Sequence, residues 1–232
     1  MTQAFHHALD EICSDLVGMA GTVVESIPRA TEVLLTGDLA GADAIINADK
    51  ALNDRALDLE ERCYDLLALN QPMASDLRRL MTVIKMVGEI ERSGDLVVNI
   101  CKAARRLYHV QLDPKLRGRI ARMGEHAAHL FQLAIEAFAD DDAAKAAALN
   151  DIDDLLDGQH RDYIRTIFEC HSTEGLELQV AVQLALVGRF YERIGDHAVN
   201  IGERVHFMVT GDLSVPHDDR APAGVPAGDG SP

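Results

Sequence analysis

A ten-residue phrase occurs twice in this chain and carries the side chains best suited to chemistry. It reads ERSGDLVVNI at 91–100 and ERIGDHAVNI at 192–201, with seven of ten letters identical. In each copy a glutamate, an aspartate and an asparagine stand four residues apart, so successive side chains turn by only ~40° around a helix. The six residues are Glu91, Asp95, Asn99, Glu192, Asp196 and Asn200. Each copy therefore predicts a stripe of oxygen atoms along one side of a helix.

Carboxylate and amide oxygens without Cys or paired His suit hard cations such as Mg²⁺, Mn²⁺, Ca²⁺ or iron, and we expect iron, Mn²⁺ or Mg²⁺ at these motifs. Two carboxylates from one helix leave such an ion incompletely coordinated, so a neighbouring helix must contribute. The candidates in the preceding helical blocks are Asp49, Asp153 and Asp157, with an offset of 104 residues between Asp49 and Asp153. The sequence thus predicts a metal site beside each phrase.

Two observations bear on the simpler alternative that the stripe is only solvated surface, as outer positions of helical bundles usually are. Carboxylates four residues apart repel each other, and both copies keep them. Gly94 and Gly195 each cost a helix up to ~1 kcal/mol relative to Ala, which indicates a close approach by another group. His197 has no counterpart in the first phrase, where Leu96 stands, and is predicted to be a surface histidine.

The two phrases must be positioned by helices. Helix-breaking and turn-forming residues divide the chain into six predicted helical segments, called blocks here. They run over about 2–35, 38–69, 75–110, 112–139, 140–169 and 176–209, with a kink expected at Pro28 and a cap at Ser75. Apolar residues alternate three and four apart from Val180 to Met208, and the same phase recurs from Val83 to Leu107, with Ser93 as the one departure. This spacing predicts a seam for packing helix on helix, with the oxygen stripes opposite to it on the outer surface.

The position of the phrase in the third and sixth blocks predicts a tandem duplication. We expect an all-α fold of two antiparallel three-helix bundles, at 1–111 and 112–211, followed by a disordered tail at 212–232. That tail is rich in Pro and Gly and has little apolar surface to offset its ordering entropy.

Composition excludes several classes of function. The formal net charge of −16 argues against nucleic acid and against charge-driven docking on anionic lipid. There is neither a signal peptide pattern nor a run of about 20 apolar residues, so we expect no membrane insertion. Four cysteines, far apart within helical patterns, predict buried free thiols rather than disulfides or a zinc site.

Catalysis finds little support in the sequence, which has no phosphate-binding Gly-rich loop and no nucleophile elbow. The alternative from the enzyme class is a metal-dependent carboxylate bundle, a ferritin-like oxidase or storage protein, which needs two Glu-x-x-His motifs. The chain has one, from Glu203 to His206, and a weaker Asp157 to His160. A third possibility is a structural helical scaffold.

The paired phrases, together with QPMASDLRRL at 71–80 and LALVGRFYERIGDHAVNIGERV at 184–205, resemble the PhoU family, in particular its actinobacterial branch. The resemblance covers residues 1–212. It implies the same fold and places the family's Glu-x-x-x-Asp metal motif on Glu91 and Asp95 and on Glu192 and Asp196. Asn53 stands where a further acid is expected, which leaves the first site less complete.

The resemblance also implies a function. PhoU-like proteins are cytoplasmic and non-enzymatic, and they regulate phosphate homeostasis. They restrain the Pst-type ABC phosphate transporter, with its ATPase subunit as a partner, and silence the sensor histidine kinase of the phosphate two-component system when phosphate is plentiful. We therefore expect an adaptor that forms a homodimer and meets basic patches on these partners through acidic helical faces.

Overall fold

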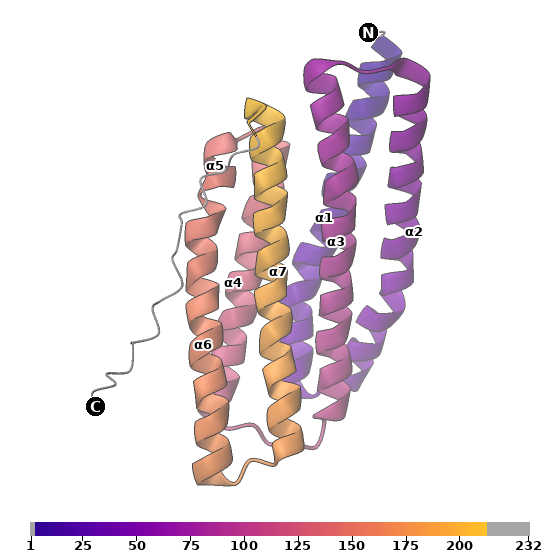
Figure 1. Ribbon diagram of the computed structural model, residues 1–232. Helices are drawn as coiled ribbons and strands as arrows, with labels where there is room; N and C mark the ends of the chain where they lie inside the picture. Colours follow the sequence, from indigo (N-terminus) through magenta and orange to yellow (C-terminus); the bar gives the residue numbers. More distant parts are fainter. Residues whose placement is uncertain (1–2, 213–232) are drawn as a thin grey trace, which may run out of the picture.

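The computed structural model describes residues 3–212, and in this part of the chain every regular element is an α-helix (Figure 1). The six long helices expected from the sequence are present, together with one short helix. The bounds are α1 Gln3–Thr36, α2 Leu39–Asn70, α3 Ala74–Arg106, α4 Pro114–Ala139, α5 Ala143–Ala147, α6 Leu149–Glu174 and α7 Leu178–Thr210. The all-α prediction is confirmed. The predicted disordered tail lies outside the described residues from 213 onwards.

Side-chain caps explain where three of the helices begin. Asp38 accepts from the backbone N–H of Gly41 at the start of α2, Asp113 precedes Pro114 at the start of α4, and Asp142 opens α5. Ser75 was the wrong cap for α3, because the N-cap position belongs to Met73, which offers no side-chain acceptor. The predicted fifth block is also divided, because the chain leaves the helix at Ala148 between α5 and α6.

The predicted seam is the core of the molecule. The seam positions from Val83 to Leu107, the C-cap of α3, are all buried, Ser93 included. In α7 the seam positions from Leu184 to Met208 are all buried. Ser93 fits the core because its hydroxyl donates to the backbone carbonyl of Glu89 at 2.8 Å. Helix packing therefore explains the three-and-four spacing.

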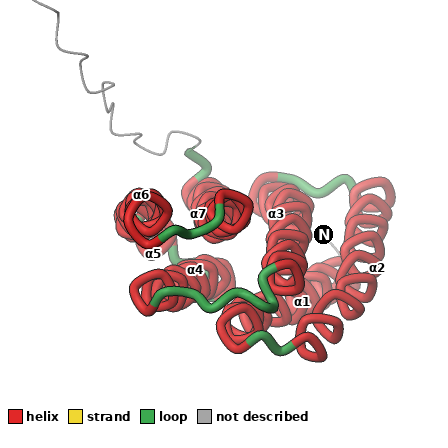
Figure 2. Tube along the Cα trace, turned by 90° about the horizontal axis from the view of Figure 1, so that it is seen from below, coloured by secondary structure: helices red, strands yellow, loops and turns green. Residues whose placement is uncertain are grey.

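The helices form two groups that pack side by side (Figures 1 and 2). Seen from below, α1, α2 and α3 lie on one side and α4, α6 and α7 on the other, with α3 next to α7 and α1 next to α4 in the middle. A single hydrophobic core runs through both groups. The boundary predicted at 111/112 falls in the connection between α3 and α4, and the division into two domains stays a prediction.

The backbone repeats the duplication that the sequence suggested. Gly37 has a positive φ of 73° and is followed by the cap Asp38, and Asp141 has a positive φ of 51° and is followed by the cap Asp142. These pairs are 104 residues apart, the same offset as between Asp49 and Asp153. The first two long helices of each group therefore correspond at this offset.

The expectation that the oxygen stripes lie on the free outer surface is wrong for part of their length. α3 contacts α1, α2 and α7, and α7 contacts α3, α4, α5 and α6, so neither helix has a wide solvated side. Gly94 and Gly195 are buried, and the side chain of Glu192 is only 14% exposed. The acids of the stripes, but not their asparagines, lie where these helices meet α2 and α6.

None of the helices within residues 3–212 is both long and apolar enough to span a bilayer. The four cysteines are free, as predicted, and all but Cys13 are buried. Burial raises the pKa of the Cys63 thiol to about 12 and that of Cys101 to about 11, so both stay as neutral thiols.

Candidate functional site

The second copy of the phrase meets α6 at Gly195, where two side chains of α6 occupy the space of a Cβ. A Cβ built on Gly195 would overlap Oδ1 of Asp153 and lie 2.8 Å from Cδ2 of Leu156. The absence of a side chain at Gly195 thus lets α6 bring the Asp153 carboxylate against α7. This confirms the close approach inferred from the glycine. We call Asp153, Asp157, Glu192 and Asp196 the second cluster.

The charges of the second cluster are poorly compensated. Burial, followed by the negative charges of Asp157 and Asp196, raises the pKa of Asp153 to about 7. Its Oδ1 atom is buried and has no hydrogen-bond donor among the described residues. Arg189 forms an ion pair with Glu192 and lies 3.9 Å from a carboxylate oxygen of Asp196. Among the described residues, no such ion pair is formed with Asp153. A buried carboxyl oxygen without a donor, facing like charges, is the environment that a cation would stabilise.

This raised pKa predicts a pH dependence of stability. Between the ordinary value of 3.8 and about 7 the folded chain holds the Asp153 proton more tightly than the unfolded chain does. The contribution of Asp153 therefore lowers the free energy of unfolding as the pH rises through this window, by roughly 1–2 kcal/mol after solvent screening.

Urea denaturation of wild type and Asp153→Asn at a series of pH values, with a chelator present, measures this contribution. The difference in stability between the variant and wild type should grow in favour of the variant from pH 4 to pH 7. A difference that stays constant across this range would show that Asp153 titrates normally.

The first copy of the phrase meets α2 in the same way. A Cβ on Gly94 would overlap Cδ2 of Leu52 and lie 3.9 Å from Oδ1 of Asp49. Burial, followed by the charge of Asp95, raises the pKa of Asp49, and the same two causes raise the pKa of Glu91. We call Asp49, Asn53, Glu91 and Asp95 the first cluster.

Asn53 replaces an acid in the first cluster, as the sequence suggested. It corresponds to Asp157 at the offset of 104, and its amide donates to Oδ2 of Asp49 at 3.5 Å. Its own Oδ1 is buried and has no partner among the described residues. The first cluster is thus one negative charge short of the second but still presents an unused buried oxygen.

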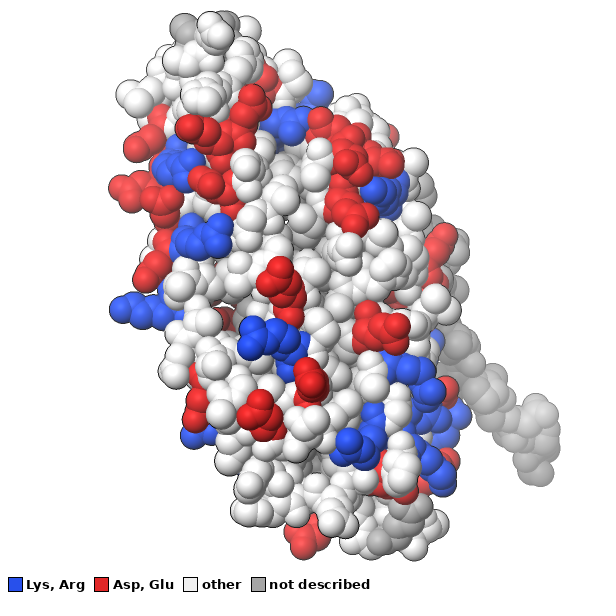
Figure 3. Space-filling model, turned by 180° about the vertical axis from the view of Figure 1, so that it is seen from behind, with Lys and Arg blue, Asp and Glu red and all other residues white. Residues whose placement is uncertain are grey.

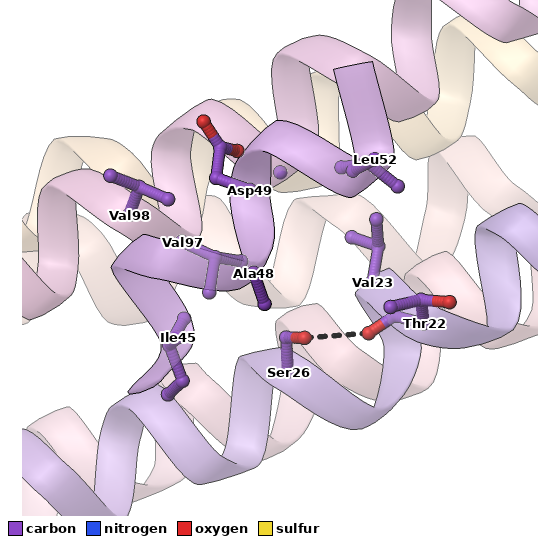
Figure 4. A pocket seen from close by; sticks show the side chains of 10 residues that line it. Thr22, Val23, Ser26, Ile45, Ala48, Asp49, Leu52, Val97 and Val98 are labelled. Carbon is purple, nitrogen blue, oxygen red and sulfur yellow. Dashed lines mark hydrogen bonds between the residues drawn. The ribbon is translucent and has the colours of Figure 1, made fainter. Parts of the chain in front are cut away.

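Figure 4 shows the small cavity beside the first cluster, between α1, α2 and α3. Apolar side chains such as Val23, Ile45 and Val97 line it, and Asp49 stands at its edge with the carboxylate turned away from Thr22 and Ser26. Its volume is about 30 Å³. This is the room of a water molecule rather than of an organic substrate.

The predicted asparagines lie apart from the acids. The amide of Asn200 approaches Oε2 of Glu89 on α3 at 3.4 Å, so this side chain belongs to the α3/α7 contact. Asn99 is half-buried, and no contact places it with Asp49. The structure brings together the acids of each phrase and those of the preceding helix, but not the asparagines with them.

The donor set of both clusters fits a hard cation in its chemistry. Within residues 3–212, however, no three His, Cys, Asp or Glu side chains are arranged as a closed metal site. Asp153 with Asp196, and Asp49 with Asp95, are the residues that would hold an ion between two helices, where it would neutralise their repulsion. The metal site stays a prediction.

The prediction that His197 is a surface histidine is wrong, and its partner was missed. His197 is 5% exposed, and its Nδ1 atom lies 2.6 Å from Oε2 of Glu89 across the α3/α7 contact. Burial alone would raise the pKa of Glu89, but the hydrogen bond and charge of His197, together with Arg92, lower it. Glu89 stands outside the repeated phrase, and no pattern within α3 alone marks it.

The two motifs considered for a di-iron enzyme lie at different levels of the bundle. Gly202, next to Glu203, packs against Ala146 and Leu149, whereas His160 packs against Gly188. The 14 residues between 188 and 202 correspond to about 21 Å along α7. The structure therefore does not bring Glu203 and His206 together with Asp157 and His160.

Comparison with known proteins connects this arrangement to one family. A sequence model described as the PhoU domain matches residues 16–104 and again 120–205. One match falls in each of the two groups of helices.

Relatives and solved structures agree with that match. The chain is 37% identical over 224 residues to the phosphate-specific transport system accessory protein PhoU homolog 1 of Mycobacterium leprae, covering 96% of this chain and 99% of that protein. It is 35% identical over 212 residues to PhoU homolog 2 of Mycobacterium tuberculosis, covering 91% and 99%. The crystal structure of PhoU from Pseudomonas aeruginosa superposes with a TM-score of 0.85 at 28% identity, over 90% of this chain and 100% of that one.

Proposed function

This chain belongs to the PhoU family, and we propose that it is a non-catalytic regulator of phosphate homeostasis that acts with a phosphate-specific transport system. The observation that carries the proposal is the extent of the match: relatives named as accessory proteins of that system align with nearly the whole chain, including both phrases. Their names state an accessory role and no catalytic activity.

We infer an adaptor mechanism for this role. The chain would restrain a Pst-type ABC transporter through its ATPase subunit and silence the sensor histidine kinase of the phosphate system, in the cytoplasm. Its charge of −16 steers it towards basic patches on such partners more than it adds affinity. The clusters between α2 and α3 and between α6 and α7 would change their charge and rigidity when a divalent cation or iron binds.

Deleting the gene and measuring phosphate-responsive expression in phosphate-rich medium tests the proposed function. We expect derepression, reversed by the wild-type gene. Unchanged expression and unchanged phosphate uptake in the deletion strain would contradict the regulatory role and leave the helical scaffold as the explanation. Co-purification of the transporter ATPase and the kinase with the tagged chain then identifies which partner is bound.

A further inference from the structure

An open groove lies between α2 and α3, two helices that stand side by side in Figure 1. Its volume is about 260 Å³, below the ~300–1,000 Å³ that is usual for sites of small organic ligands. It has room for one long side chain rather than for a whole substrate. We call it the α2/α3 groove, and its lining includes Asn53, Ala56, Leu57, Glu60, Gly88 and Glu91.

The duplication places longer side chains at the same positions of the second half. At the offset of 101, Gly88 of α3 corresponds to Arg189 of α7. At the offset of 104, Ala56 of α2 corresponds to His160 of α6. The leucines that crowd the two phrase glycines are also 104 residues apart, which supports the alignment. The groove is therefore open in the first half because two small residues replace two long ones.

In the second half an arginine of the chain itself lies at this position. Arg189 forms an ion pair with Glu192, the counterpart of Glu91. Burial, and next the charge of Arg189, lowers the pKa of His160, so the guanidinium also lies near α6. A guanidinium thus accompanies the phrase glutamate of the second half, between α6 and α7.

The phrase glutamate of the first half has no such partner. Within residues 3–212 neither Glu91 nor Glu60 forms an ion pair, and Arg92 forms its own with Glu89. The Oδ1 atom of Asn53 is buried and has no donor among these residues either. The groove therefore offers two carboxylates and an amide oxygen, all of which can accept hydrogen bonds from a cation.

The shape and chemistry of the groove suit an arginine side chain. A guanidinium presents a planar fork of N–H donors, which carboxylate oxygens accept in pairs. Its apolar stem can lie along Ala56 and Leu57 while the charge reaches the acids. Asp49 and Asp95, the residues that would hold a metal ion, lie outside the lining of the groove. The two kinds of cation would thus bind at separate places.

The surroundings of the groove are typical of a contact between proteins. Leu57 and Tyr64 are 66% and 54% exposed, and their spacing places them on the same side of α2 as Glu60. Tyrosine and arginine are among the residues that contribute most to the affinity of protein interfaces. Figure 3 shows that acidic side chains also gather on the back of the molecule, at the upper left over α1 and α2. The field of the first half therefore favours a basic partner.

We propose that the α2/α3 groove receives an arginine side chain of a protein partner, in the position that Arg189 occupies in the second half. The guanidinium pairs with Glu91 and Glu60, and Oδ1 of Asn53 accepts a further hydrogen bond. The proposal rests on the proposed adaptor role in expecting a protein as the occupant. It does not require a bound metal.

Two blocked peptides of the sequence Gly-Leu-Xaa-Leu-Gly test the groove, one with arginine at Xaa and one with citrulline, its uncharged isostere. Their binding is followed by NMR titration of the purified chain at ~50 mM salt, where charge attraction is screened least, with a chelator present. Wild type should bind the arginine peptide at least ~10-fold more tightly, because only the guanidinium forms charge-assisted hydrogen bonds. Gly88→Arg places the chain's own guanidinium in the groove and should weaken this binding at least ~10-fold, as should Glu91→Gln.

Two control variants separate the groove from the general negative charge. Gly88→Ala should bind as wild type does, since its Cβ meets only the guanidinium nitrogens of Arg92, at 3.9 Å. Gly21→Arg adds the same charge where nothing lies within 4 Å of the virtual Cβ, and it should bind as wild type does too. Circular dichroism shows that each variant is folded.

A wild type that binds neither peptide, or both alike, overturns the proposal. So does a folded Gly88→Arg variant that binds the arginine peptide as tightly as wild type. An equal loss of binding in Gly21→Arg would show that the peptide responds to net charge alone, which overturns it as well. These measurements use the purified chain, so their failure leaves the gene-deletion test of the proposed function unaffected.

Discussion

Replacing Glu89 by Phe is expected to lower the free energy of unfolding by about 2–4 kcal/mol, and adding His197→Leu is expected to bring it back to within about 1 kcal/mol of wild type. The single change leaves His197 buried without its carboxylate partner. Breaking a buried pair is costly, whereas replacing both members by apolar groups is often neutral.

The choice of Phe and Leu comes from the duplication. At the offset of 101 that relates the phrases, Glu89 corresponds to Phe190 and His197 to Leu96. Both of these apolar residues pack against the core. Since α3 and α7 pack against each other, the duplication relates the Glu89–His197 pair to a second pair in these helices, Phe190 and Leu96. The double variant places the same two apolar residue types at positions 89 and 197.

Urea denaturation of the four proteins of this double-mutant cycle, at pH 7 and without divalent cations, measures the coupling. We expect a coupling of at least ~2 kcal/mol, as for other buried pairs that lose one partner. Additive effects of the two substitutions would show that Glu89 and His197 do not stabilise each other.

Gly195→Ala is expected to destabilise the chain by about 1–3 kcal/mol, although Ala is the better helix former. The new Cβ would overlap Asp153 and crowd Leu156, which forces α6 away from α7 or the carboxylate out of its place. It would also weaken any cation binding at the second cluster.

Gly21 offers the matched control, because it also lies inside a helix but has nothing within 4 Å of its virtual Cβ. Gly21→Ala should stabilise by ~0.5–1 kcal/mol, the ordinary gain of Ala over Gly in a helix. If thermal unfolding shows that both substitutions stabilise, then α6 does not approach α7 as closely as described.

The sequence was most informative where local chemistry decides the structure. The alternation of three- and four-residue steps in both phrase helices correctly identified their buried sides, and Asp38 and Pro114 marked helix starts. The glycines of the phrases correctly indicated where a second helix approaches. Asp49 and Asp153 were named because a neighbouring helix had to complete the coordination of an ion, and their offset of 104 residues is the one that the backbone turns before α2 and α5 share.

The predictions that were wrong depend on contacts between helices that are far apart in the sequence. A seam describes one packed side of a helix, but α7 packs on α3, α4 and α6, so the position of His197 could not be read from periodicity within α7. The break at Ala148 has no Gly or Pro to announce it, and Ala favours a continuous helix. Ala148 keeps right-handed helical backbone angles (φ −74°, ψ −12°), and its neighbours Ala146 and Leu149 both lie against Gly202.

Each phrase, together with the acid of the preceding helix, is expected to bind a hard cation. Calorimetric titration of the metal-stripped chain with Mn²⁺ tests this binding most directly. We predict two binding events for wild type, with Asp153→Asn abolishing one and Asp49→Asn the other. Absence of binding to wild type, or binding that survives both substitutions together, would contradict the claim.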